Sequence, residues 1–162
     1  MSVACIPVEK IPFELRRPDQ WVAWRYELRE GKRTKVPMRV DGKGRASTTA
    51  PSTWSGFEEA LRAAERFDGI GFVFTESDPY IGFDLDNCRL ENGLLEPGAA
   101  SLILLLDSYA EWSASGMGAH VIVKGSLAGH SGRRTGRVEV YSSGRYFAMT
   151  GNHLVGTPLE IR

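Results

Sequence analysis

The sequence is poor in cysteine and has no long apolar run. Cys5 and Cys88 are the two cysteines among 162 residues, and their separation matches neither a disulfide framework nor a zinc motif. The longest apolar run, residues 102–106, is far too short to span a bilayer. The first residues lack the basic start and long apolar stretch of a signal peptide. We therefore expect a cytoplasmic protein without a membrane partner.

The chain also lacks a net charge, although its charges are unevenly distributed. Residues 1–48 hold 11 Lys and Arg against 6 Asp and Glu, residues 49–112 hold 3 against 12, and residues 113–162 hold 6 against 2. An acidic centre therefore lies between two basic flanks. This pattern fits a metal on the carboxylates and a polyanion on a basic rim, and it fits ordinary surface charge equally well.

The main functional signal of the acidic centre is the segment Gly-Phe-Asp-Leu-Asp at residues 82–86. With the period of two of a strand, apolar residues share one face, while Asp84 and Asp86 share the other, about 7 Å apart. Two like charges in a strand are unfavourable, and carboxylate oxygens are the ligands that Mg²⁺ and Mn²⁺ prefer. A metal site is one interpretation, and a solvated acidic face is the other.

The hydrophobic pattern predicts one α+β domain with a largely antiparallel sheet. Pro37 predicts that the strand that contains it is an edge strand or is irregular in the middle. The turn sequences at residues 76–79 and 142–144 predict two hairpins. The expected strands cover residues 21–26, 34–40, 70–75, 80–86, 120–125, 138–141 and 145–150.

Two helices are expected between these strands. Ser55 and Glu58 have the spacing of a capping box at the start of the first helix. A second helix is expected to begin near Pro97. Its buried side is expected to carry Leu102, Leu105 and Leu106. Residues 1–20 are expected to form an extended lead-in, and residues 126–137 a mobile basic loop.

Two later strands place polar groups opposite valines in the same way. His120 lies on one face of its strand, and Glu139 shares a face with Tyr141. A lone histidine is usually structural, and a strand glutamate is usually solvated. If these strands are neighbours in one sheet, however, Asp84, Asp86, His120 and Glu139 line a common cleft.

Three segments follow one another in a specific order: Gly-Phe-Asp-Leu-Asp at 82–86, Ser-x-Ser-Gly-x-Gly-x-His at 113–120, and Val-Glu-Val-Tyr-x-x-Gly-Arg-Tyr-Phe at 138–147. This order resembles the archaeo-eukaryotic primase superfamily. It is most similar to the primase–polymerase (PrimPol) domains of phage and plasmid replication proteins. The likeness begins at Trp21 and continues to Asn152, so it spans nearly the whole chain.

The resemblance implies a fold, an activity and a metal site. The implied fold is an RRM-like catalytic sheet over about residues 69–162, joined to a small N-terminal α/β unit over about residues 1–68. The implied activity is template-dependent nucleotidyl transfer by two-metal catalysis, as a DNA primase and DNA polymerase in phage or plasmid replication within a bacterial host cell. The family motifs assign Asp84, Asp86 and Glu139 as catalytic ligands of Mg²⁺ or Mn²⁺.

The resemblance also implies a nucleotide site. It assigns His120 to the phosphates of the incoming nucleotide. The turn before this histidine contains Ser115, Gly116 and Gly118.

Basic and aromatic residues add further candidates. Cations stabilise charge that develops on a triphosphate; our candidates for this role are Lys35, Lys124 and Arg145. Basic loops suit template phosphates; the candidates there are Lys43, Arg45, Arg133, Arg134 and Arg137. Tyr141 is a candidate for stacking on a base. For each of these residues, surface charge or core packing is the other interpretation.

The expected partners are a DNA template or primer, a dNTP or NTP, and a helicase domain or protein, because relatives continue into a helical segment and a helicase. Our hypothesis is that DNA-dependent extension is retained here, whereas de novo priming needs help from elsewhere. A catalytically silent RRM-like nucleic-acid-binding module is the alternative, although it has no need of a repulsive aspartate pair. A rolling-circle replication nuclease is a weaker alternative, since it needs paired histidines, and His130 and His153 lie in expected loops.

Overall fold

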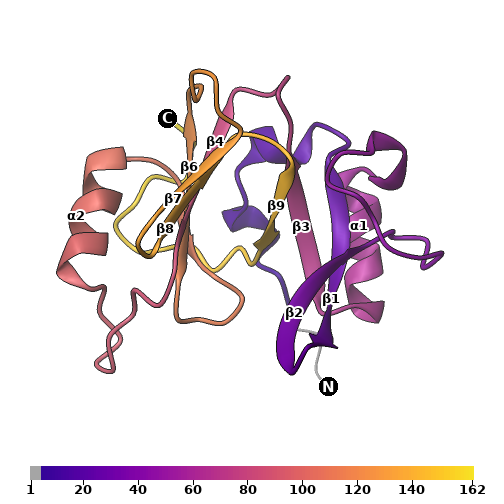
Figure 1. Cartoon of the computed structure of the whole chain (residues 1–162), viewed down its shortest axis with the longest axis horizontal. Helices are drawn as coiled ribbons and strands as arrows, with labels where there is room; N and C mark the ends of the chain where they lie inside the picture. Colours follow the sequence, from indigo (N-terminus) through magenta and orange to yellow (C-terminus); the bar gives the residue numbers. More distant parts are fainter. Residues whose placement is uncertain (1–4) are drawn as a thin grey trace.

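The computed structural model describes residues 5–162, which form two antiparallel sheets that lie side by side with a helix on each (Figure 1). The first four residues of the expected lead-in lie outside this range. The rest of the lead-in is not extended throughout, because it contains two 3₁₀ helices, η1 (Val8–Lys10) and η2 (Phe13–Arg16). The predicted α+β class with antiparallel sheets is confirmed.

The first sheet has the strand order β2-β1-β3-β9. Its strands are β1 (Trp21–Arg29), β2 (Lys32–Met38), β3 (Gly69–Phe74) and β9 (Arg145–Met149). Strands β1 and β2 are joined through Glu30 and Gly31, which both have positive φ, as a type I′ hairpin turn requires. Pro37 lies in the edge strand β2, so the prediction made from its missing N–H is confirmed.

The second sheet has the strand order β5-β6-β4-β8-β7. Its strands are β4 (Tyr80–Leu85), β5 (Ala110–Trp112), β6 (Ala119–Lys124), β7 (Gly132–Thr135) and β8 (Val138–Tyr141). The acidic strand β4 is central, with β6 and β8 as its antiparallel neighbours. Part of the expected mobile loop at residues 126–137 is therefore a strand, because β7 pairs with β8.

The helices are short and few. They are α1 (Phe57–Ala63), its 3₁₀ continuation η4 (Ala64–Arg66), the 3₁₀ helix η3 (Pro51–Thr53), and α2 (Pro97–Leu106). Figure 1 shows α1 beside the first sheet and α2 on the outer side of the second. In residues 5–162, no helix is long and apolar enough to cross a membrane.

The two helices differ in detail from the expectation. Helix α2 begins at Pro97 as predicted, but Leu105 is 80% exposed, and Ala99 and Ile103 are its buried residues. The predicted capping box is wrong. The Ser55 hydroxyl instead lies within hydrogen-bond distance of the carbonyls of Trp21 and Gly56, because a backbone bridge pairs Ser55 with Trp21.

The two predicted hairpins are also wrong, because both connections cross from one sheet to the other. Strand β3 has β1 and β9 on its two sides, so no position beside it is left for β4. Asp78 stabilises the crossing, since its carboxylate accepts hydrogen bonds from the N–H groups of Thr75 and Tyr80, at 2.8 and 2.9 Å. Residues 142–144 return the chain from β8 to β9. The sheets therefore do not divide at residue 68, as β3 and β9 belong with β1 and β2.

The interface between the sheets is aromatic and closely packed. Phe74 and Phe147 of the first sheet meet edge to face, with ring centroids 4.9 Å apart, and Ile122 of the second sheet belongs to the same core. A Cβ atom on Gly82 of β4 would lie 2.5 Å from the Phe147 ring and 2.8 Å from the Phe74 ring. Gly82 therefore lets the sheets approach each other two residues before Asp84.

Replacing Gly82 with alanine is expected to destabilise the fold, because the methyl group overpacks the interface. The expected loss is about 1–3 kcal/mol, which lowers the melting temperature by roughly 2–4 °C per kcal/mol for a domain of this size. Thermal denaturation measures the change. The control is Gly98→Ala on α2, where a Cβ atom meets nothing within 4 Å. Equal melting temperatures for the two variants would contradict the packing argument.

Candidate functional site

Three neighbouring strands bring Asp84, His120 and Glu139 together. In the sheet register, Asp84 is directly opposite His120 on β6 and directly opposite Glu139 on β8. Directly opposed residues share a face of the sheet. This face looks toward the first sheet, as Gly82 shows from the same strand. The cleft expected from strand periodicity is therefore present for Asp84, His120 and Glu139, whereas Asp86 lies just beyond the end of β4 and does not line it.

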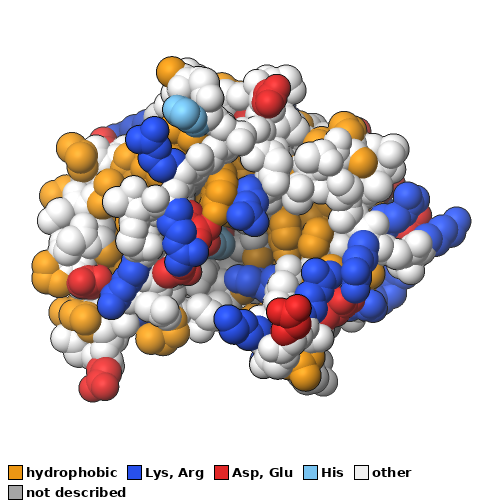
Figure 2. Space-filling view, in the orientation of Figure 1, with side chains coloured by type: hydrophobic (Ala, Val, Ile, Leu, Met, Phe, Trp, Pro, Cys, Tyr) orange, Lys and Arg blue, Asp and Glu red, His pale blue; other side chains and the backbone are white. Residues whose placement is uncertain are grey.

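A cavity of about 340 Å³ lies between this face and strands β2 and β9. Its acidic wall contains Asp84 and Glu139, and its basic wall contains Lys35 and Arg145. The other lining residues are Arg33, Thr34, His120, Tyr141, Tyr146, Phe147 and Ala148. Figure 2 shows Lys and Arg side chains on both sides of a hollow on this face of the molecule, with acidic atoms inside it.

Asp84 is the electrostatic centre of the cavity. Burial raises the pKa of its carboxyl, and the nearby carboxylates of Asp86 and Glu139 raise it further. His120 and Lys35 act in the opposite direction and lower the same pKa. The carboxylates of Asp84, Asp86 and Glu139 thus repel one another, and Lys35 and His120 partly offset this effect on Asp84.

The three carboxylates suit a divalent cation in ligand type, but they are not arranged around one. Across the described residues 5–162, no group of three His, Cys, Asp or Glu side chains could hold a metal ion as placed. One oxygen of Glu139 lies 2.7 Å from Nη1 of Arg134, and the other accepts the Tyr141 hydroxyl. The Arg134 guanidinium also lies 4.0 Å from Asp86. The Arg134 guanidinium thus balances the negative charge of Glu139 and Asp86.

His120 lies between two carboxylates and is only 4% exposed. Its Nε2 is 3.7 Å from Oδ1 of Asp84, and its Nδ1 is 3.5 Å from Oε1 of Glu111 on β5. The imidazole stacks on Phe147, with ring centroids 4.5 Å apart. The sequence pattern did not single out Glu111 as a candidate. The available sign was its charge within the apolar segment Ala-Glu-Trp, two residues before the turn that leads to His120.

The predicted triphosphate residues separate into two groups. Lys35 and Arg145 line the cavity. Lys124 does not, because it lies four residues beyond His120 on β6, where its ammonium is 3.1 Å from Glu14. Arg33, which the sequence analysis missed, also lines the cavity and lies over the Tyr26 ring at 4.0 Å. Its shared strand face with Lys35 was the available signal.

The turn before His120 uses its own backbone donors. The N–H of Gly116 donates to the Ser113 carbonyl, the N–H of Met117 to the Ser115 hydroxyl, and the N–H of Gly118 to the Ser113 hydroxyl. A Cβ atom on Gly118 would lie 2.6 Å from the Leu85 carbonyl oxygen. Ser115, Gly116 and Gly118 therefore shape the turn against the end of β4.

The predicted template residues do not form one surface. Arg134 reaches the acidic site, whereas Arg133 lines a separate apolar pocket on the opposite face of β7 and β8. Arg137 lies 3.7 Å from Glu96. In the loop that follows β2, Arg45 pairs with Glu27 of β1 at 2.7 Å, and Lys43 is exposed.

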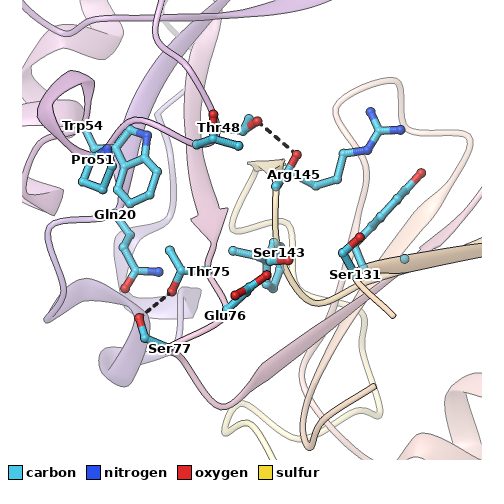
Figure 3. Close-up of a pocket in the computed structure, with 15 residues that line it drawn as sticks. Gln20, Thr48, Pro51, Trp54, Thr75, Glu76, Ser77, Ser131, Ser143 and Arg145 are labelled. Atoms are coloured by element: carbon cyan, nitrogen blue, oxygen red, sulfur yellow. Dashed lines mark hydrogen bonds between the residues drawn. The ribbon is translucent and has the colours of Figure 1, made fainter. Parts of the chain in front are cut away.

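A larger cavity of about 860 Å³ shares Tyr141 and Arg145 with the acidic one. Figure 3 shows that hydroxyl, amide and aromatic side chains line it, among them Gln20, Trp54 and Ser143. Across this cavity, the Thr48 hydroxyl, in the loop that follows β2, donates to the Gly144 carbonyl at 3.0 Å. The Arg145 guanidinium lies 4.7 Å from the centre of the Tyr141 ring. A polar groove therefore leads away from the acidic site.

Comparison with known proteins supports a primase–polymerase relationship. The chain is 38% identical over 145 residues to a protein named DNA Primase-polymerase from Nitratiruptor phage NrS-1. The match covers 85% of this chain but 20% of the relative, so the chain spans about a fifth of that protein. No family model matches the sequence.

Replacing Asp84 with asparagine is expected to stabilise the metal-free protein at neutral pH, because burial and neighbouring carboxylates disfavour the charge. A gain on the order of 1 kcal/mol is expected. The gain is complete above the raised pKa of Asp84 and disappears as the pH falls toward the ordinary value of 3.8. Denaturant unfolding in a chelator at several pH values measures it.

Asp41 provides the control of opposite sign. The guanidinium of Arg39 lowers the pKa of Asp41 to about 2. The carboxylate of Asp41 therefore stabilises the fold above pH 3.8, and Asp41→Asn is expected to lower stability at neutral pH. A loss of stability in both variants would contradict the electrostatic account of Asp84.

Proposed function

We propose that this chain is the catalytic domain of a DNA primase–polymerase, which adds nucleotides to a DNA strand by template-dependent nucleotidyl transfer. One observation carries the proposal: Asp84, His120 and Glu139 share a cavity with Lys35 and Arg145, although they come from five different strands of two sheets. The identity with the phage primase–polymerase supports it. An α-phosphate that is attacked by a 3′-hydroxyl needs this combination of carboxylates and cations.

Asp84, Asp86 and Glu139 would hold Mg²⁺ or Mn²⁺ in this proposal, once Arg134 is displaced from Glu139 and Asp86. When bound between carboxylates and triphosphate, such ions lower the pKa of the attacking hydroxyl and neutralise charge on the leaving oxygens. Carboxylate oxygens suit both ions. The raised pKa of Asp84 supports the assignment, since it reflects burial and, to a smaller extent, repulsion by Asp86 and Glu139, both of which a bound cation would offset.

The basic wall would bind the triphosphate. Lys35 already lowers the pKa of Asp84, so its ammonium acts on the acidic site from the facing sheet. Arg145 lies over the Tyr141 ring, which restricts the guanidinium to the cavity side of the strand. The Nε2–H group of His120 would donate to a phosphate oxygen beside Asp84. The hydroxyl-lined groove that starts at Tyr141 would guide a DNA strand away from the reacting atoms, and Trp54 offers it a stacking surface.

The silent nucleic-acid-binding module is not favoured by the geometry. Binding alone gives no reason to bury Asp84 beside Glu139 and Asp86 at an energetic cost. A rolling-circle nuclease needs paired histidines, and His120 is the one histidine in residues 5–162 that lines the cavity. His153 bonds to the Pro158 carbonyl and the Thr157 hydroxyl, and it contributes nothing to the cavity.

A primer-extension assay tests the proposal directly. The protein is incubated with Mn²⁺ or Mg²⁺, a primed DNA template and labelled dNTPs or NTPs. We expect extension by the parent chain and at least about 100-fold less by Asp84→Asn, since metal-held catalysis supplies several kcal/mol. The matched control is Asp107→Asn, at the exposed end of α2, where it pairs with Arg162. Template binding without extension under all these conditions would favour the silent module.

Lys35 and Lys124 form a second comparison. Lys35→Ala is expected to raise the KM for the nucleotide by about 10- to 100-fold, because a charge-assisted contact to phosphate is lost. Lys124→Ala is expected to change KM by less than about twofold, since its ammonium is held by Glu14 outside the cavity. Steady-state extension kinetics distinguish the two, and equal effects would remove Lys35 from the nucleotide site.

A further inference from the structure

Glu111 is a fully buried carboxylate that the proposed chemistry does not use. It is 0% exposed, and its oxygens accept the Tyr109 hydroxyl at 2.7 Å and the N–H groups of Thr150 and Gly151 at 3.0 and 2.9 Å. An unpaired buried carboxylate is strongly unfavourable. Three donors offset that cost, so the fold is built to keep an acceptor at this position.

The carboxylate has acceptor capacity left, and His120 lies beside it. Four lone-pair sites are available on a carboxylate, of which three are used. Glu111 is the direct register partner of His120, and its Oε1 is 3.5 Å from Nδ1. Among the described residues, Nδ1 of His120 is the one buried side-chain nitrogen or oxygen without a hydrogen-bond partner. A small rotation of either side chain closes this gap.

The surroundings of the ring leave little other freedom. Phe147 stacks on one face of the imidazole, and the side chain is nearly inaccessible to water. A proton on Nδ1 directed at Glu111 leaves Nε2 facing Asp84 and the cavity. A carboxylate bonded to one ring nitrogen is a general means of setting the tautomer and orientation of a histidine.

We infer that Glu111 is a positioning residue: it holds the proton on Nδ1 of His120 and thereby directs Nε2 into the acidic cavity. The consequence for nucleotide binding rests on the proposed function, whereas the state of the ring does not. Glu111 also anchors Thr150 and Gly151 to β5, so the test must separate this structural role from the positioning of His120.

The first measurement is the ¹⁵N–¹H spectrum of the histidine rings in the intact protein, with His120 assigned by loss of its signals in His120→Asn. We expect Nδ1 of His120 to carry a proton in the parent. In Glu111→Gln, the amide can donate to Nδ1, so the proton is expected on Nε2 instead. The control is Tyr109→Phe, which removes one partner of Glu111 without touching His120. Its His120 signals should match the parent.

An unprotonated Nδ1 in the parent protein overturns the inference even if Glu111→Gln does not fold. An unchanged ring spectrum in a folded Glu111→Gln overturns it as well.

The second measurement separates the inference from the proposed function. If His120 binds nucleotide phosphates, the ring in the complex carries protons on both nitrogens, because a phosphate oxygen only accepts hydrogen bonds. Glu111→Gln removes the carboxylate beside that cation and should raise the KM for the nucleotide by about 10-fold, while Tyr109→Phe should not. A changed ring spectrum with an unchanged KM supports the positioning role and overturns the assignment of His120 to the phosphates. A parent protein that shows the expected spectrum but extends no primer supports the positioning role and contradicts the nucleotidyl-transfer proposal.

Discussion

The contact of Gly82 with the rings of Phe74 and Phe147 determines how closely the two sheets approach each other. The acidic site depends on that approach, because its two walls belong to different sheets. Asp84 lies two residues from Gly82 on the same face, and Lys35 and Arg145 stand opposite it. A larger residue at position 82 would separate the walls, so the cavity and the core share one constraint. Phe147 serves both, since it packs on Phe74 and stacks on His120.

The buried charge of Asp84 is unfavourable for the stability of the fold, whereas the proposed chemistry requires it. Asp84 is held in an environment that raises its pKa, with further carboxylates nearby. The fold answers with positive charge from two directions, from Lys35 on β2 and from Arg134 on β7, which binds Glu139. Glu111 on the next strand, β5, faces the side of His120 that is turned away from Asp84. His120 therefore has a carboxylate on each side. Perturbed pKa values of this kind cluster at functional sites.

Sequence periodicity predicted the shared face of Asp84, His120 and Glu139, because side chains alternate with a period of two in any strand. Turn chemistry was a poorer guide to the connections between strands. The turn residues at 76–79 and 142–144 are compatible with hairpins, yet both segments cross between sheets, since turn residues do not encode which sheet edge is free. Lys124 shares the strand face of His120 and still misses the cavity, because it lies four positions further along β6, where it contacts Glu14. Glu111 and Arg33 were missed although both had a local signal, because no motif marked either residue and their place at the site depends on how the strands pack.

The sequence by itself determined the α+β class, the edge position of Pro37 and the polar strand faces that carry Asp84, His120 and Glu139. These features are local, because they follow from backbone periodicity and from the missing N–H of proline. Only the tertiary structure decided that β3 and β9 join the first sheet, that Lys35 and Arg145 face Asp84, and that Glu111 supports His120. Such contacts depend on the packing of side chains far apart in the chain, where the shape of Gly82 and its aromatic neighbours selects one arrangement.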